Sequence, residues 1–141
     1  MKILVIGVNS SGLVMPIVDE MRTQGHDVTY LENGEISHYR YLHPTERVAN
    51  VIAKGLFKRN IKKERSALAT TQYLKGFVQD RYFDLAILTN PDIYTSEHLD
   101  LLKGCSGRLV CHLWDSADRM PGNLRLISKF DRVMSFDPKD I

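Results

Sequence analysis

The first twelve residues constrain the fold of this chain more than any other stretch. Lys2–Gly7 reads KILVIG and is almost entirely apolar, Val8–Gly12 is a short loop with polar residues, and a helical pattern begins at Leu13. A continuously apolar strand that runs through a tight loop into a helix is typical of a parallel sheet buried on both faces. The stretch therefore predicts the first βα unit of an α/β domain.

The same alternation continues along the chain. Further strands are expected at Asp27–Leu31, Phe83–Thr89, Arg108–Trp114 and Asp131–Phe136. Helices are expected over Leu13–Gln24, from Thr45 to Phe57, and over Ser66–Arg81, Ser96–Lys103 and Asn123–Lys129. Strands that alternate with helices predict a parallel sheet with right-handed crossovers. We therefore predict one Rossmann-like domain over residues 1–141, a doubly wound three-layer α/β/α fold of about five strands in the order 3-2-1-4-5.

Bulk properties narrow the function. No apolar run is long enough to cross a bilayer, and the N-terminal apolar run is shorter than the core of a signal peptide, so we expect a cytoplasmic protein. Cys105 and Cys111 form no C-x-x-C pair, and the histidines have no ligand spacing, so no metal site is expected. A net charge of +2 is too small to indicate nucleic-acid binding by itself.

The loop at Val8–Gly12 is the first candidate binding element. Ligands of doubly wound folds bind at the carboxyl ends of the strands, where backbone N–H groups and a helix N-terminus favour anions. The glycine spacing is G-x-x-x-x-G rather than G-x-G-x-x-G, although Glu32 follows the second strand, where a ribose-binding acid would lie. A stand-alone nucleotide- or dinucleotide-binding domain is therefore one alternative.

Polar residues also follow the third and fourth strands. Trp114 and Asp115 come at the end of the fourth strand, and Asn90 and Asp92 at the end of the third. Asp115, and in second rank Asp92, could accept a proton from a substrate hydroxyl as a general base. Trp114 could stack on a sugar or a base. The structural alternative is that Asp115 caps a turn and Trp114 fills the core.

A basic segment is the clearest feature of the charge pattern. Its cations are Lys54, Lys58, Arg59, Lys62, Lys63 and Arg65. On a helix flanked by Leu56, Phe57 and Ile61, these cations could contact anionic lipid, and the alternative is a solvated helix face. Aromatic residues do not interleave with the cations, so we expect no nucleic-acid partner.

Four stretches resemble the N-terminal domain of bacterial two-Rossmann (GT-B) glycosyltransferases, in the group that serves lipopolysaccharide, capsule and spore-coat glycosylation and includes CgeB-like proteins. The stretches are KILVIG…SSG at the start, Tyr82–Ile87, CHLWDSADR at Cys111–Arg119, and FDRVMSFDPKD at Phe130–Asp140. In that family the N-terminal domain binds the acceptor, a second domain binds the nucleotide-sugar co-substrate, and no cofactor is tightly bound.

The resemblance implies a set of cleft residues. Ser10, Ser11 and Gly12 would line the cleft floor, with Asn9 beside them. The wall would be formed by Asn90, Trp114, Asp115, Phe136 and Asp137. The basic segment would face a glycan or lipid-linked acceptor, which would bring the protein to the inner face of the membrane.

We therefore expect a glycosyltransferase acceptor-side domain that lacks the donor-binding half. A third alternative is a non-catalytic interaction module that dimerises through the fifth strand, because an edge strand must be short, covered or paired.

Overall fold

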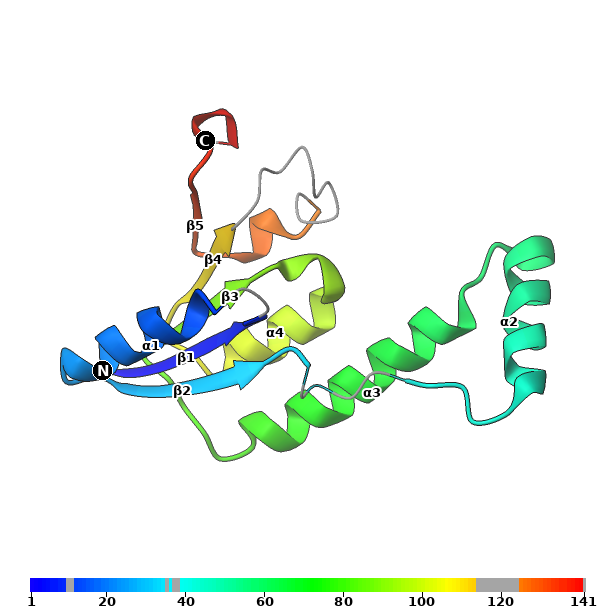
Figure 1. Cartoon of the computed structure of the whole chain (residues 1–141), viewed down its shortest axis with the longest axis horizontal. Coiled ribbons are helices and arrows are strands. Elements are labelled where there is room, and N and C mark those ends of the chain that lie inside the picture. The colour runs from blue at the N-terminus through cyan, green and yellow to red at the C-terminus, as the bar shows by residue number, and fades with distance from the viewer. Residues whose placement is uncertain (10–11, 35, 37–38, 114–124, 141) are drawn as a thin grey trace.

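The computed structural model describes residues 1–9, 12–34, 36, 39–113 and 125–140 (Figure 1). The strands are β1 (Lys2–Gly7), β2 (Asp27–Glu32), β3 (Leu85–Thr89), β4 (Leu109–Leu113) and β5 (Arg132–Ser135). The α-helices are α1 (Val14–Thr23), α2 (Pro44–Phe57), α3 (Ile61–Val78) and α4 (Ser96–Gly104). Short 3-10 turns are η1 (Pro91–Ile93), η2 (Ile127–Lys129) and η3 (Pro138–Asp140).

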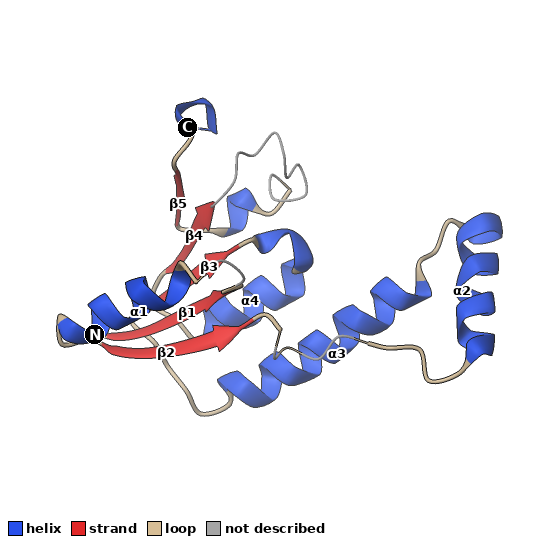
Figure 2. Cartoon of the chain, viewed as in Figure 1, coloured by secondary structure: helices blue, strands red, loops and turns tan. Residues whose placement is uncertain are grey.

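The five strands form one parallel sheet in the order β2-β1-β3-β4-β5. This confirms the doubly wound α/β fold, with helices on both faces of the sheet (Figure 2). The expected order 3-2-1-4-5 is wrong, because β3 lies on the other side of β1 from β2. The order depends on whether the connection after β2 places β3 beside β2 or on the far side of β1. The apolar pattern within a single element does not encode that choice. The centre of the sheet is therefore β3 rather than β1.

The two faces of the sheet have separate apolar cores. On one face, Leu4 and Leu88 are fully buried and belong to a cluster with Leu74 of α3 and Leu99 of α4. On the other face, Val14 and other α1 residues pack against β1 and β2. Successive strand side chains point to opposite faces, so the continuous apolar run of β1 supplies both cores.

On the α1 side, the described residues leave part of the sheet uncovered. Beyond α1, a groove is lined by Leu85 and Ile87 of β3, Val110 of β4 and Met134 of β5. Arg108 and Arg132 lie along the same groove.

Several element boundaries differ from the expected ones. Helix α3 begins at Ile61 rather than Ser66, because the Asn60 side chain caps it by accepting the Lys63 backbone N–H (3.1 Å). Lys58 ends α2 in a left-handed conformation, so the basic segment covers the end of one helix, a turn and the start of another. The fourth strand ends at Leu113. Of the helix expected at Asn123–Lys129, the described residues form only η2, and residues 123 and 124 lie outside them.

Helix α2 stands away from the sheet and contacts the N-terminal half of α3, and we call α2 together with that half of α3 the arm (Figures 1 and 2). An amphipathic helix normally buries its apolar side, but α2 does the opposite. Asn50 is buried on the inner side, whereas Val48 and Ile52 are 58% and 51% exposed on the outer side. The apolar side of this helix therefore points away from the rest of the described chain. Within the described residues, no helix is long and apolar enough to cross a membrane.

Candidate functional site

The carboxyl ends of β1 and β3 lie side by side and form the switch point of the sheet, where the chain connections diverge to opposite faces. A Cβ on Gly7 would lie 2.5 Å from Thr89 Oγ1, so only glycine allows the two strands to approach this closely. The Thr89 hydroxyl donates to the Ile6 carbonyl (3.4 Å), and the Tyr30 hydroxyl donates to the Gly7 carbonyl (3.3 Å). Glycine at position 7 therefore has a packing reason that involves no ligand.

The loop after β1 is closed by its own hydrogen bonds. Asn9 Oδ1 accepts the Val14 N–H at the start of α1 (3.2 Å), and the Gly12 N–H donates to the Asn9 carbonyl (3.1 Å). Gly12 has φ of +66°, where a side chain would be strained. Two N–H groups that could bind a phosphate are thus already satisfied. Ser10 and Ser11 lie outside the described residues.

The turn after β3 has a strained backbone. Asn90 adopts φ 61° and ψ 73°, a left-handed conformation that costs about 1 kcal/mol or more outside glycine. The chain then enters η1 at Pro91, and Asp92 follows as a half-buried carboxylate. The left-handed turn at Asn90 leads the chain from β3 into η1 and on to α4.

A pocket of about 390 Å³ lies between the arm and the β3–α4 connection. The charged residues that the structure describes in its lining are four cations and one carboxylate, namely Lys54, Lys62, Lys63, Arg125 and Asp92. Polar groups come from Asn60, Ser66, Thr70 and Thr95, and apolar ones from Ile36, Ala67, Ile93 and Tyr94. We call this site the basic pocket. The excess of positive charge favours an anionic ligand.

One wall of the basic pocket is fixed to the sheet. The hydroxyl of the fully buried Tyr94 donates to Asn33 Oδ1 (2.5 Å), and the Asn33 N–H donates to the Gly7 carbonyl (2.8 Å). Burial raises the pKa of Tyr94, so the phenol stays protonated. Arg125 Nη2 reaches the carbonyls of Asp92 (3.4 Å) and Tyr94 (3.2 Å). The β3–α4 connection is therefore held from both sides.

His98 fixes the start of α4 behind that wall. Its Nδ1 accepts the Thr95 N–H (3.1 Å), while Thr95 Oγ1 accepts the His98 N–H, a reciprocal cap. Because Nδ1 is an acceptor, Nε2 carries the proton and donates to the Ala67 carbonyl of α3 (3.0 Å). Burial lowers the pKa of His98, which keeps the ring neutral. This histidine is a structural residue that joins α4 to α3.

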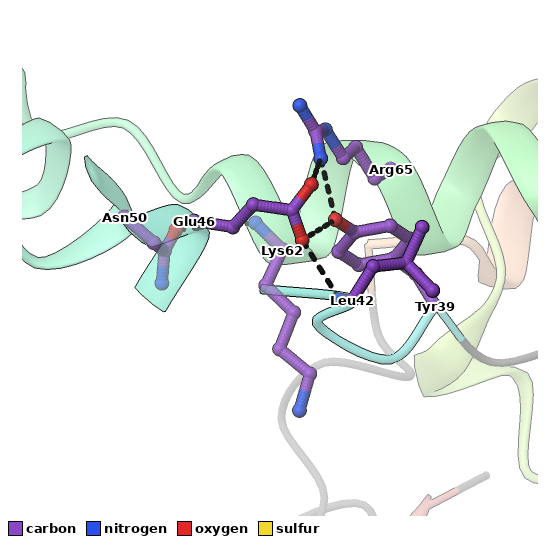
Figure 3. A network of polar contacts seen from close by, with 6 residues as sticks. All are labelled: Tyr39, Leu42, Glu46, Asn50, Lys62 and Arg65. Atoms are coloured by element: carbon purple, nitrogen blue, oxygen red, sulfur yellow. Dashed lines mark hydrogen bonds and ion pairs between the residues drawn. The ribbon is translucent and has the colours of Figure 1, made fainter. Parts of the chain in front are cut away.

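The opposite wall depends on polar contacts within the arm (Figure 3). The Glu46 carboxylate accepts the Tyr39 hydroxyl (2.6 Å), the Leu42 N–H (2.9 Å) and Arg65 Nη1 (2.7 Å). These hydrogen bonds, that of Tyr39 foremost, lower the pKa of Glu46 to about 2. Beside them, Asn50 Nδ2 donates to the Tyr41 hydroxyl (2.8 Å), and Asn50 Oδ1 accepts the Lys62 N–H (3.1 Å).

The six cations of the basic segment have different surroundings. Arg59 pairs with Glu64 (2.8 Å) and Arg65 with Glu46, so these two stabilise the arm. Lys58 is exposed at the end of α2. The remaining three, Lys54, Lys62 and Lys63, line the basic pocket. The sequence reasoning missed Arg125, because it lies sixty or more residues from these lysines and no local pattern marks it.

Of the other expected site residues, those that the structure describes lie outside the lining of the basic pocket. Trp114 and Asp115 lie outside the described residues. Phe136 and Asp137 follow β5, which β3 and β4 separate from β1. Asp137 Oδ1 accepts the Lys139 N–H (3.0 Å) and so caps η3, while Phe136 is exposed. Glu32 ends β2 as a half-buried residue in register with Gly7.

In the part of the chain that the structure describes, no three His, Cys, Asp or Glu side chains are grouped so that they could hold a metal ion. Both cysteines are buried free thiols, and burial raises the pKa of Cys111 to about 12.

Comparison with known proteins adds no family assignment. The chain matches no protein-family model, and no curated protein matches it significantly. The functional argument therefore depends on the site itself.

Proposed function

We propose that this domain binds the acceptor substrate in a glycosyl transfer, as the acceptor-side half of a two-domain glycosyltransferase. The observation that carries the proposal is the basic pocket, which opens beside the carboxyl ends of the strands of a doubly wound sheet. Ligands of such sheets bind at this edge. The hydroxyl and amide groups of the lining suit a sugar, and the resemblance of four sequence stretches to GT-B N-terminal domains supports the same role.

Two carboxylates are candidates for the chemical step. Asp92 lies in the basic pocket and could accept the proton of an acceptor hydroxyl held within hydrogen-bond distance. Asp115 keeps the same proposed role from its place after β4. The donor, a nucleotide-sugar, would bind to a second domain, and its sugar would approach from the open side of the carboxyl edge.

Binding measurements test the proposal against the nucleotide-binding alternative. The purified chain is applied to an array of bacterial surface glycans, and it is titrated with UDP, NAD and FMN by calorimetry. We expect glycan binding that Asp92→Asn and Thr95→Val weaken, and that the control Lys75→Gln, on α3 outside the basic pocket, leaves unchanged. Saturable micromolar binding of NAD or FMN without glycan binding would instead favour a nucleotide-binding domain.

A further inference from the structure

We propose that the basic pocket binds a phosphate group of its ligand, held between the lysines of α3 and the guanidinium of Arg125. This inference deepens the proposed function and rests on it only for the ligand's role as an acceptor. The anion site itself is argued from the charges and the unused donors of the described residues that line the pocket.

The charges come from three separate segments and converge on one cavity. Lys54 comes from α2, Lys62 and Lys63 from the first turn of α3, and Arg125 from the chain before η2. Among the described lining residues, Asp92 is the sole carboxylate. The described lining therefore has an excess of three positive charges, which a ligand with one carboxylate would not neutralise. A phosphate ester or a diphosphate, with two or more negative charges, balances them better.

A threonine side chain of α3 lines the same cavity. Thr70 is 8% exposed and faces the pocket from α3, and its hydroxyl makes no hydrogen bond within the described residues. A hydroxyl that has no partner among the described residues can donate its hydrogen to a ligand. A phosphate oxygen would accept a hydrogen bond from this hydroxyl.

Arg125 is positioned in advance and still has donors to offer. Nη2 holds the guanidinium against the carbonyls of Asp92 and Tyr94. Its other nitrogen atoms make no hydrogen bond to the described residues. A guanidinium has five N–H donors in a rigid plane, so one edge can bind the protein while another binds a phosphate.

The two lysines of α3 occupy an unfavourable place in the absence of an anion. The N-terminus of an α-helix carries a partial positive charge, and cations are normally found at the other end. Lys62 and Lys63 fall in the first turn of this 18-residue helix, and the acid of that turn, Glu64, already pairs with Arg59. Local conflicts of this kind are expected at functional sites, and a bound phosphate would remove this one.

Calorimetric titration at fixed ionic strength tests the inference. The probes are pyrophosphate, glucose 1-phosphate and unphosphorylated glucose. We expect the two phosphates to bind with a Kd at least tenfold lower than that of glucose. Lys62→Gln/Lys63→Gln should weaken phosphate binding about tenfold or more, because charge-assisted hydrogen bonds are lost. The matched control Lys75→Gln/Lys139→Gln removes the same charge elsewhere and should change the Kd less than about twofold.

A second variant separates binding from folding. Thr70→Val keeps the shape of the side chain and removes the hydroxyl, and it should weaken phosphate binding several-fold with an unchanged circular dichroism spectrum.

Sedimentation with vesicles of phosphatidylcholine, with and without phosphatidic acid, distinguishes a lipid-borne phosphate from a soluble one. Retention on phosphatidic acid that depends on Lys62 and Lys63 would identify the lipid source.

The outcomes distinguish this inference from the proposed function. Equal phosphate binding by wild type and Lys62→Gln/Lys63→Gln, or equal loss in the control, would overturn the phosphate site. If glycans still bind in that case, the acceptor role stands without it. If phosphate binds at the pocket but no glycan does, the anion site stands and the acceptor role is wrong.

Discussion

The sheet and the arm are built in opposite ways. In the sheet, side chains such as Leu4, Leu88 and Leu99 are buried in apolar cores on which helices pack. In the arm, polar contacts of Glu46 and Asn50 hold α2 to α3 (Figure 3). The apolar side chains Val48 and Ile52 of α2 are exposed. Apolar burial stabilises a fold over many contacts, whereas a few polar contacts can be lost one at a time.

This difference matters because the basic pocket lies between the two regions. One wall, from Asp92 to Thr95, is fixed to the sheet through Tyr94 and Asn33. The other wall carries three of the four cations and belongs to the arm. Regions with few buried apolar contacts open at lower free energy than the core. We therefore expect the arm wall to adjust to a ligand while the sheet wall stays in place.

The largest effect is expected in the sheet. Leu88→Ala removes a fully buried side chain at the centre of the sheet and should lower the free energy of unfolding by about 3 kcal/mol. Leu68→Ala, on an exposed position of α3, is the control and should change it by less than about 0.5 kcal/mol. Urea denaturation followed by circular dichroism measures both. Equal effects would contradict the assignment of the core.

A smaller, local effect is expected in the arm. Asn50→Ala removes the side chain that bonds both Tyr41 and the start of α3, at a cost of about 1–2 kcal/mol to the attachment of α2. Hydrogen exchange should accelerate in α2 and leave the β-strands unchanged. If the strands exchanged faster by the same factor, the arm and the sheet would unfold as one unit.

Acid should affect the two regions in different pH ranges. The pKa of Glu46 is lowered to about 2 in the folded protein from a usual value of 4.5, so its stabilisation is complete above about pH 4.5 and is lost as the pH falls toward 2. The pKa of the buried His98 is also lowered, so the neutral ring stabilises the fold at high pH, and this contribution declines below about pH 6.5.

Hydrogen exchange at several pH values separates the two groups. Glu46→Gln should abolish the change in α2 between pH 4.5 and 2, and His98→Gln should reduce the change around α4 that begins below pH 6.5. A response of α2 that survived Glu46→Gln would contradict the role given to this carboxylate.

The smallest effect on stability is expected on the outer side of α2. Val48→Gln and Ile52→Gln alter exposed residues and should change the free energy of unfolding by less than about 0.5 kcal/mol. An exposed apolar face can nevertheless drive association, so the substitutions should lower any self-association. Analytical ultracentrifugation over a range of protein concentrations measures this change. The expected dimer through the fifth strand would instead respond to substitutions in β5.

The sequence was sufficient for the strands and the fold class, but not for the strand order or the pocket. Apolar runs such as Lys2–Gly7 predicted the strands, because burial on both faces leaves a local signature. Tertiary packing leaves no local signature in the sequence. It decides the order of the strands, the outward direction of the apolar side of α2, and the place of Arg125 and Lys62 in one pocket. The start of α3 was an intermediate case. Asn60 is a common capping residue, but the charged residues after it hid the helical periodicity.

The contact between Gly7 and Thr89 should also restrict which residues evolution accepts at these two positions. A side chain at position 7 and a branched hydroxyl side chain at position 89 exclude each other, because the added Cβ would lie 2.5 Å from Thr89 Oγ1. Substitution at either position should therefore depend on the other. Among relatives of this chain, alanine at the first position should co-occur with glycine or alanine at the second, and the two sites should covary although they stand eighty-two residues apart.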